Sequence, residues 1–526
     1  MASLDQISQH SGSTSATLQT FLGAILLAGI YWVLTGGQQP VGGIPIIQID
    51  RNKNERSWRA WRSTASDFQV RPQEVVENGE KVPGGIFQVK AGAGYKVVLP
   101  NHFAHELRNN PDLAFDQAVE NDFHTHLPGF DGMKESSRRD GLMADIVRIK
   151  LTQALGLLTT DLVDETDYAV KLWLGHRDDW TNTVLKPGAL DVITRVSSRI
   201  FGGKELARDE QWLEITKNYT IYAFQAAYKL HEWPKALRPI ANWFFEDDAK
   251  TARKYVAEAR RLVTPQVEKR LKARDEAIAS GVSSKALPDV FSWALDVAKG
   301  RPINFAETQL ALSMAAIHTS TELTMRVMIM LCEHPEVIEP LRQEMITVLK
   351  QDGWAKTSLY KMKLLDSFIK ECQRFSQMAI ASMHRYVTKP VTLSNGTTLP
   401  TGTCILVLDN GTQNPEYYSS PEKFDAWRYL KMRQRPGEEN QHQLVTTGTD
   451  NLGFGHGQHA CPGRFFASNE IKIVLCYLLI QYDWRLEPGK SALPDLEFEH
   501  VRNANPGTVV QYKSREAEID VLDPTA

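Results

Sequence analysis

The chain has only five cysteines in 526 residues, and no two of them form a Cys-x-x-Cys pair. An odd number of cysteines without such a pair argues against both a disulfide framework and a zinc cluster. The sequence therefore favours a reducing compartment, and each cysteine has to be interpreted by its own neighbours. The five are Cys332, Cys372, Cys404, Cys461 and Cys476.

The chain also lacks a strong charge imbalance. Its 60 Lys and Arg residues stand against 63 Asp and Glu residues, and no basic block or stripe occurs. Proteins that bind nucleic acid need such a patch to neutralise phosphates. The composition therefore excludes nucleic acid as the expected partner.

No Asp, Glu, Lys or Arg occurs between Asp5 and Asp50, and the segment 21–34 contains only apolar, aromatic and glycine residues. A helix of about 20 such residues spans the hydrocarbon core of a bilayer. We interpret 17–36 as a transmembrane anchor and 1–16 as a lumenal segment. The basic residues that follow place the rest of the chain in the cytosol by the positive-inside rule. A cleaved signal peptide is the alternative, but its usual positive n-region is missing.

The rest of the chain divides into a connector and one large body. Residues 37–50 are rich in Gly and Pro, which predicts a short, semi-rigid connector. Within the body, 51–526, short β-prone runs with turn residues occupy the stretch 80–130, and long helical periodicities dominate 138–380. We expect a mainly α fold with a smaller β lobe.

One stretch near the C-terminal end concentrates unusual chemistry. Cys461 lies among glycines and directly precedes an apolar helix. Glycines permit a tight bend with positive φ. Because Pro462 has no amide hydrogen, backbone donors to the Cys461 sulfur have to come from Gly463 and Arg464. Such a loop suits a thiolate that binds iron, whereas a lone cysteine is usually a small buried hydrophobe.

Five positions in ten match the pattern Phe-x-x-Gly-x-His-x-Cys-x-Gly, with Cys461 at the cysteine position. This pattern resembles the haem-thiolate loop of the cytochrome P-450 superfamily. The resemblance implies haem b with the Cys461 thiolate as axial iron ligand, an arrangement that favours O–O bond cleavage. It also implies the cytochrome P-450 fold, in which the haem lies between a long central helix and the cysteine loop. The residues that it assigns to the cofactor are Cys461, His459, Arg385, Phe454, Gly455 and Gly463.

The segment 305–331 is the expected central helix, since most of its residues are apolar or small. Its centre, 315–320, contains small residues and adjacent hydroxyls, which in an ordinary core helix bond their own backbone carbonyls. The resemblance instead implies a groove for dioxygen, in which Thr319 holds the water that delivers protons. The family usually has an acid where this chain has His318, so the identity of the second proton relay stays open.

Glu371 and Arg374 are i,i+3 neighbours on a predicted helix with an apolar flank. Such pairs are common on solvated surfaces, where they contribute little. Together with Arg428 they resemble the buried Glu-Arg-Arg network of the family, for which we expect a structural role behind the haem. Arg385 occupies the place from which family members direct an arginine to a haem propionate.

Two further sets of residues bear on the substrate side. His124 and His126 have a spacing that invites a metal site, but no third ligand is near, so a substrate-side loop is the better interpretation. The resemblance implies a pocket of apolar or small residues, which suits a hydrophobic molecule. The expected pocket residues are Met314, Ala315, Met378 and Ala381.

The resemblance covers residues 40–515 in family order. It implies a monooxygenase of the endoplasmic reticulum membrane that uses dioxygen and electrons from an NADPH-dependent reductase. The reaction is a hydroxylation, an epoxidation or a multistep C–H oxidation. The residues of these motifs are similar to those of filamentous-fungal members in terpenoid, indole-diterpene or meroterpenoid biosynthesis. The alternatives are a reductase-independent isomerase, dehydratase or peroxygenase, and a non-catalytic haem sensor.

Overall fold

The computed structural model describes residues 39–49, 67–280 and 289–525, together with Gly23. The predicted lumenal segment, the anchor apart from Gly23, and the first residues of the predicted catalytic domain lie outside this part. Within it, no helix combines the length and the apolar character that crossing a bilayer requires.

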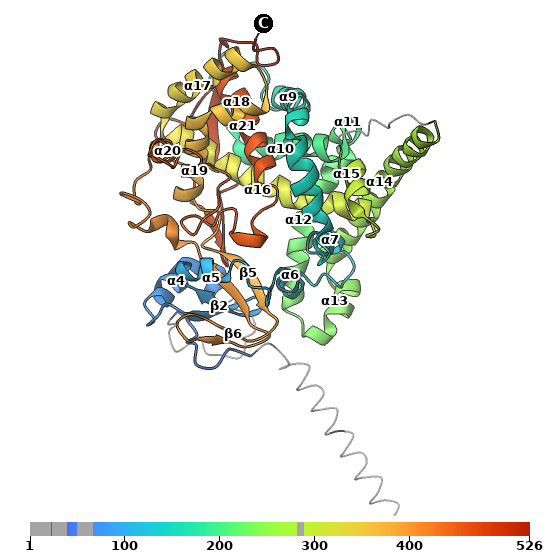
Figure 1. Cartoon of the computed structure of the whole chain (residues 1–526), viewed down its shortest axis with the longest axis vertical. Coiled ribbons are helices and arrows are strands. Elements are labelled where there is room, and N and C mark those ends of the chain that lie inside the picture. The colour runs from blue at the N-terminus through green and yellow to red at the C-terminus, as the bar shows by residue number, and fades with distance from the viewer. Residues whose placement is uncertain (1–22, 24–38, 50–66, 281–288, 526) are drawn as a thin grey trace, which may run out of the picture.

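Helices form most of the molecule (Figure 1). The longer ones are α9 (Thr152–Trp173), α10 (Leu185–Gly202), α12 (Glu210–His231), α14 (Asp247–Ala279), α16 (Phe305–Glu333), α17 (Ile338–Asp352), α19 (Lys363–Phe375) and α21 (Arg464–Gln481). The shorter ones include α3 (Asp67–Val70), α4 (Pro72–Glu80), α5 (Ala104–Leu107), α6 (Phe115–Phe123), α7 (Asp131–Ser136), α8 (Leu142–Asp145), α11 (Lys204–Ala207), α13 (Arg238–Phe244), α15 (Val290–Ala298), α18 (Lys356–Lys361) and α20 (Arg428–Arg433). A short π-helical turn, Ile146–Leu151, links α8 to α9.

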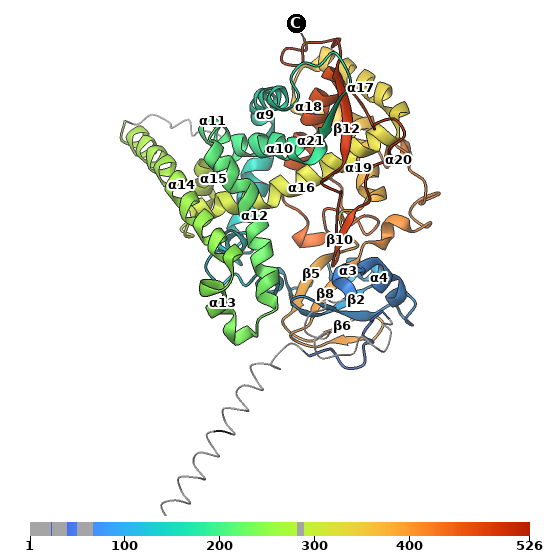
Figure 2. The same cartoon turned by 180° about the vertical axis from the view of Figure 1, so that it is seen from behind.

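Helix α16 runs through the middle of the molecule in both views (Figures 1 and 2). It packs against α10, α12 and α14, and further along against α19 and α21. Most of its residues are buried, as expected for a helix that is apolar on nearly every face. It ends at Glu333 because Pro335 disfavours helical backbone at His334, which adopts φ −124° and ψ 63°.

The β lobe is built on a five-stranded sheet with the strand order β1-β2-β8-β5-β3. The strands are β1 (Phe87–Ala91), β2 (Gly94–Leu99), β3 (Leu113–Ala114), β5 (Ala381–Val387) and β8 (Cys404–Leu408). Strand β8 pairs in parallel with β2 and antiparallel with β5, and all five of its residues are buried. A strand that is covered on both faces has an unbroken run of apolar residues. The sequence of β8, Cys-Ile-Leu-Val-Leu, is such a run.

The described part of the predicted connector, 39–49, lies along this sheet. The backbone N–H of Ile47 donates to the Gln88 carbonyl at 2.9 Å, and the Gln88 side chain donates to the carbonyl of Ile44 at 2.6 Å. The C-terminal part of the connector is therefore hydrogen-bonded to β1.

Three smaller sheets complete the β structure. Strands β4 (Thr181–Val184), β12 (Val509–Ser514) and β9 (Tyr482–Arg485) form one, and β10 (Leu496–Phe498) with β11 (Val501–Asn503) forms another. The third is the hairpin of β6 (Val391–Thr392) and β7 (Thr398–Leu399), whose turn contains Gly396 at φ 87°. The predicted fold class, mainly α with a smaller β lobe, is confirmed.

Candidate functional site

The Cys461 loop connects a short 3-10 turn, Gly457–His459, to the start of α21. Gly455 and Gly457 have φ values of 66° and 78°. A Cβ atom on Gly457 would stand 2.5 Å from the carbonyl oxygen of Arg108, so only glycine fits there. The Cys461 amide donates to the Phe454 carbonyl at 2.8 Å, which closes the loop.

The two backbone amides expected from the sequence act on the Cys461 sulfur. Burial raises the pKa of the Cys461 thiol, and the amides of Gly463 and Arg464 act against this effect. The Arg464 guanidinium also donates to the Cys461 carbonyl at 2.8 Å and to the Val445 carbonyl at 2.9 Å. The two amides thus favour the anionic sulfur, but burial outweighs them, so a thiolate at neutral pH needs a metal ion beside it.

The other four cysteines differ from Cys461 in their surroundings. All four are buried, whereas Cys461 is partly exposed. Burial raises the pKa of the thiols of Cys332 and Cys404 to about 12. They pack as small apolar side chains and offer no ligand to a metal.

Helix α16 presents an exposed stripe near its middle. Ala315 and Thr319 are exposed, one turn apart, although Ile317 and Ser320 between and beside them are buried. The Thr319 hydroxyl donates to the Ala315 carbonyl at 2.7 Å and lies 3.3 Å from that of Ala316. Because most of α16 is buried, the exposure of these two residues indicates a space beside the middle of the helix that no described side chain fills.

His318 points to another side of α16. Its Nε2 lies 2.9 Å from the Lys217 carbonyl oxygen of α12, and burial lowers the pKa of its imidazole. The structure therefore does not bring the His318 ring together with the Thr319 hydroxyl. The role of His318 in proton delivery stays a prediction that this geometry does not favour.

Basic side chains surround the cysteine loop. Arg385 is buried, with 5% of its surface exposed, and burial lowers the pKa of its guanidinium to about 10. Its guanidinium donates to the His384 carbonyl oxygen at 2.7 Å, and no carboxylate within the described ranges pairs with it. His459 lies close by, and burial together with Arg385 and Arg148 lowers the pKa of its imidazole to about 4.

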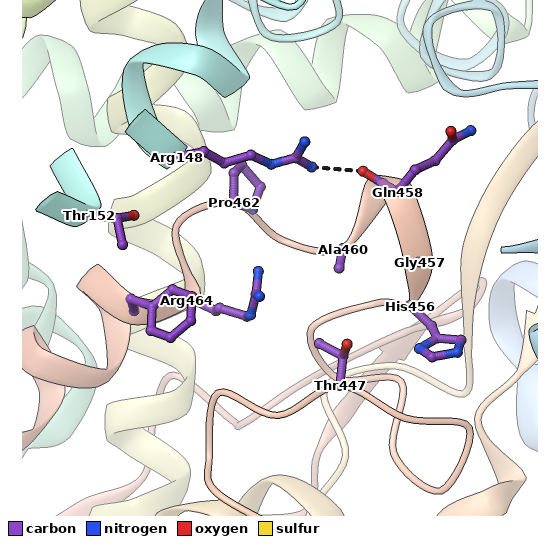
Figure 3. Close-up of a pocket in the computed structure, with 10 residues that line it drawn as sticks. Arg148, Thr152, Thr447, His456, Gly457, Gln458, Ala460, Pro462 and Arg464 are labelled. Carbon is purple, nitrogen blue, oxygen red and sulfur yellow. Dashed lines mark hydrogen bonds between the residues drawn. The ribbon is translucent and has the colours of Figure 1, made fainter. Parts of the chain in front are cut away.

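Arg148 is a residue that the sequence analysis missed. It donates to the Gln458 carbonyl at 2.7 Å and so reaches the cysteine loop from the π-helical turn before α9 (Figure 3). In the sequence it is one basic residue in an amphipathic helical stretch, and only the tertiary fold reveals its position. Arg148 and Arg385 together give this region a positive charge that a bound group with two carboxylates would neutralise, and the neutral His459 can add a hydrogen bond.

A hollow of about 400 Å³ opens beside the loop (Figure 3). Backbone and side chains of the loop form one wall, and Arg148 and Thr152 form the opposite one. No acidic residue lines it. The lining residues are Arg148, Thr152, Thr447, His456, Gly457, Gln458, Ala460, Pro462, Arg464 and Phe465.

The Glu371 carboxylate is the centre of a buried ion network. Arg374 donates to both of its oxygens at 2.8 Å, and the Arg428 Nε lies 3.1 Å from each. The remaining guanidinium N–H groups donate to backbone carbonyls, among them those of Thr412 and Ser419. The structure thus brings the three residues together, on the α19 side of the cysteine loop.

The four predicted pocket residues fall in different places. Ala315 belongs to the exposed stripe, and Met314 and Met378 are partly buried. Ala381 is 3% exposed and packs in the apolar core under the sheet. It is the first residue of β5, whose residues alternate between buried and half-buried positions, and its side chain packs in that core.

The two histidines after α6 hold no metal cluster. His126 pairs with Glu120, and the buried His124 packs its ring against His231 at 4.9 Å between centroids. Among the described residues no group of three or more His, Cys, Asp or Glu side chains is arranged to hold a metal ion. Cys461 is a single candidate ligand, which would suit an iron that is held mainly by a cofactor.

Comparison with known proteins identifies the family. A model of the cytochrome P450 family matches residues 68–511. Cytochrome P450 monooxygenase bsc2 of Alternaria brassicicola is 36% identical over 506 residues, which are 96% of this chain and 95% of the relative. Dihydromonacolin L monooxygenase LovA of Aspergillus terreus is 34% identical over 486 residues, 92% of this chain and 90% of the relative.

A solved structure agrees in fold. Retinoic acid bound cyanobacterial CYP120A1 has a TM-score of 0.64 and 18% identity, and the alignment covers 90% of this chain and 100% of that one. The residues around the loop fit a haem, because two backbone amides face the sulfur and the buried Arg385 has no carboxylate partner among the described residues. The chain therefore belongs to the cytochrome P450 family, and it is a monooxygenase that binds haem through the Cys461 thiolate.

Proposed function

We propose that this monooxygenase oxidises a hydrophobic secondary metabolite of the terpenoid, indole-diterpene or meroterpenoid type. The observation that carries the proposal is the exposed stripe of α16, where Ala315 is small and the only hydrogen-bonding side chain is that of Thr319. A pocket wall of this kind binds through apolar contact and holds few polar groups.

The relatives support the oxidation of a small organic molecule in fungal secondary metabolism. LovA is named for its action on dihydromonacolin L, and cytochrome P450 monooxygenase hepE of Aspergillus oryzae is 38% identical over 476 residues. At this level of identity, relatives share the type of reaction more often than they share the substrate. The position of the oxidation and the number of oxidation steps belong to the individual pocket.

The chain's own residues prepare and control the reaction. Bound haem supplies dioxygen activation and the transfer of one oxygen atom to the substrate. The Cys461 loop directs two backbone amides at the sulfur, which would stabilise its anionic form once iron is bound. The Thr319 hydroxyl, whose proton is directed at the Ala315 carbonyl, can accept a hydrogen bond from water and so hold a proton donor beside the groove. Arg385 and Arg148 would balance the two carboxylates of bound haem b, and His459 would offer them a hydrogen bond.

We further propose that an NADPH-dependent reductase docks at the hollow beside the loop. Arg148 borders it, and no acid lines it, so an acidic partner surface complements it. A rate of electron transfer that falls with added salt supports this partner. A rate that does not respond to salt contradicts it.

Location in the endoplasmic reticulum membrane, with a cytosolic catalytic domain, is also a proposal. It rests on the apolar segment 21–34 and on an exposed apolar cluster at α13, where Trp243, Phe244 and Phe245 are 55%, 79% and 61% exposed. Aromatic and basic residues together favour a lipid interface. If the full chain is released from membranes by alkaline carbonate, the single-pass anchor is wrong.

The experiment that tests the proposed function is reconstitution of the full chain with a reductase and NADPH. Candidate terpenoids, indole-diterpenes and polyketide-derived compounds are offered, and mass spectrometry detects added oxygen. Incorporation of ¹⁸O from dioxygen into one compound class supports the proposal. Turnover without NADPH and reductase favours an isomerase, dehydratase or peroxygenase, and a fixed sixth ligand that no compound displaces favours a sensor.

A further inference from the structure

Two buried charged residues of α16 are not used by the mechanism above. Arg326 has 1% of its surface exposed and Glu322 has 5%. Counted from Ala315, the residues Thr319, Glu322 and Arg326 follow at helical spacing, so all four lie on one face of the helix. Glu322 and Arg326 therefore continue the exposed stripe toward the C-terminal end of α16.

The Arg326 guanidinium joins α16 to two other segments of the chain. Its Nη1 donates to the hydroxyl of Ser376, the residue directly after α19, and to the Asp495 carboxylate at 3.0 Å. Its Nη2 donates to the Arg502 carbonyl in β11 at 3.1 Å. Ser376 lies two residues before Met378, so this one side chain bonds a segment that contains a predicted pocket residue.

The Glu322 carboxylate bonds the second of these segments as well. Its Oε1 accepts a hydrogen bond from the Arg326 Nε at 2.8 Å and one from the backbone N–H of Ala504 at 2.6 Å. Its Oε2 lies 3.8 Å from the Lys186 Nζ. The ion pair of Glu322 and Arg326 thus bonds the carbonyl of Arg502 and the amide of Ala504 at the same time.

The two segments that the ion pair bonds are also paired with each other. The Ile380 amide donates to the His500 carbonyl at 2.8 Å, and the Arg502 amide donates to the Met378 carbonyl at 2.9 Å. An antiparallel bridge lies between these two bonds. The two segments, 376–380 and 500–504, therefore form one unit that is fastened to α16 through Arg326 and Glu322.

This unit borders the space beside the exposed stripe. The face of α16 is open at Thr319 and covered at Glu322, which follows about 5 Å further along the helix axis. Ala504 contacts Glu322 at the point where the cover begins. The unit of 376–380 and 500–504 is therefore the wall at which the open space ends.

We propose that Arg326 is a positioning residue that determines how long a hydrophobic substrate fits beside Thr319, because it fastens the end wall of the pocket to α16. The inference deepens the proposed function and rests on a substrate that binds along the exposed stripe. A guanidinium suits this role, since its planar group of donors reaches several fixed acceptors at once. Without it, the wall is held to α16 by fewer bonds and yields to a longer ligand.

The test uses full-length ferric holoenzyme as wild type, Arg326→Met and Ser376→Ala, with Arg342→Met as the matched control. Arg342 is a buried arginine of α17 that donates to the carbonyls of Leu479 and Tyr482 at 2.7 and 3.0 Å, at the end of α21 remote from the cysteine loop. Its loss is expected to lower stability and to leave the pocket unchanged. Stability alone therefore does not separate the variants, and a pocket-specific readout is needed.

The probes are N-methylimidazole, N-hexylimidazole and N-dodecylimidazole, which bind haem iron through nitrogen and shift its Soret band. In the wild type, affinity is expected to rise from the methyl to the hexyl probe, because the chain enters an apolar pocket, and to fall for the dodecyl probe, which meets the wall. Arg326→Met is expected to bind the dodecyl probe at least about fivefold more tightly than the wild type, and the methyl probe with wild-type affinity. Ser376→Ala, which removes one contact of Arg326, is expected to shift the dodecyl probe in the same direction, and it decides the matter if Arg326→Met does not retain haem.

The inference is wrong if the dodecyl probe binds to the Arg326 and Ser376 variants as it does to the wild type, or if Arg342→Met changes the dependence on chain length equally. If the hexyl probe binds to the wild type no more tightly than the methyl probe, no apolar pocket follows the stripe, and the pocket of the proposed function fails together with the role of Arg326. If the probes behave as expected but no terpenoid, indole-diterpene or meroterpenoid is oxidised, the proposed substrate class fails and the role of Arg326 stands.

Discussion

Arg374 donates two parallel hydrogen bonds to Glu371, from Nε to Oε2 and from Nη2 to Oε1, each 2.8 Å long, and neither side chain has any exposed surface. Arg428, the first residue of α20, approaches the same carboxylate at 3.1 Å. Each charge in this network was removed from water at a large cost, and only the partners compensate for it. The network therefore fixes how α19 and the segment 412–428 lie behind the cysteine loop.

Glu371→Gln is expected to destabilise the protein by about 3–5 kcal/mol, because two buried guanidinium groups lose their counter-charge. The measurement is the midpoint of chemical unfolding, together with the amount of haem that the protein retains. Glu487→Gln serves as control, because Glu487 forms the same i,i+3 kind of pair with Lys490 on the surface. The Glu487–Lys490 pair is expected to contribute less than about 1 kcal/mol to the free energy of unfolding. An equal loss in both variants would contradict the account.

Thr319→Ala is expected to leave haem binding intact and to divert reducing equivalents to peroxide. The hydroxyl at the Ala315 carbonyl is lost, and the water that it holds loses its partner. The measurement compares NADPH consumed, product formed and peroxide released. Thr319→Ser keeps the hydroxyl and is expected to restore most of the coupling. Coupling that is unchanged in Thr319→Ala removes this residue from proton delivery.

The raised pKa of the buried Glu470 carboxyl predicts how the stability of the protein depends on pH. The unfolded carboxyl titrates near its ordinary pKa, and the folded one at about 7, so the folded state binds the additional proton between these values. Stability is therefore lost as the pH rises through this window and is constant above it. Against Glu470→Gln, which does not titrate, the wild type is expected to lose roughly 3 kcal/mol between pH 4.5 and 7. If the stability of the two proteins varied with pH in the same way, the Glu470 carboxyl would not be neutral in the folded state.

Lys96 is a buried cation of the β lobe that is held by two acids. Its Nζ lies 2.7 Å from the Asp122 carboxylate and 3.8 Å from that of Glu499, and the Lys96 side chain is 2% exposed. Lys96→Met leaves both acids buried without a cation, and we expect a loss of about 3–5 kcal/mol. Lys171→Met, at an exposed pair with Asp167, is the control with an expected change below about 0.5 kcal/mol.

The same pair gives a pH effect with a definite sign. Lys96 lowers the pKa of the Asp122 carboxyl well below its usual range. A group with a depressed pKa contributes stability above its ordinary pKa and loses that contribution as the pH falls. The difference in stability between wild type and Lys96→Met is therefore expected to shrink in acid. A difference that grows on acidification would show that the pair is not ionised in the folded state.

Local sequence patterns predicted the elements that local physics controls. The glycines around Cys461, the missing amide of Pro462 and the long apolar run of α16 each predict a definite piece of structure, and each is found. The i,i+3 spacing of Glu371 and Arg374 likewise predicted a pair, although only the apolar flank suggested that it is buried.

The rest depends on which segments meet in space. Nothing near Arg148 in the sequence indicates that it reaches the Gln458 carbonyl, 310 residues away. The side of the helix that His318 faces depends on the packing of α12 against α16, and the face on which Ala381 lies depends on the register of β5. Glu470 reads as one polar residue in an apolar helix, and its hydrogen-bond partner Ser197 comes from another helix.

The central claim is that Cys461 ligates a haem as a thiolate, and the carbon-monoxide spectrum of the reduced protein tests it most directly. The wild type is expected to show the red-shifted Soret band of a haem thiolate. Cys461→Ala is expected to lack this band. Cys332→Ala changes a buried cysteine on α16, away from the loop, and is expected to keep the band. Survival of the band in Cys461→Ala, or its loss in Cys332→Ala alone, would contradict the assignment.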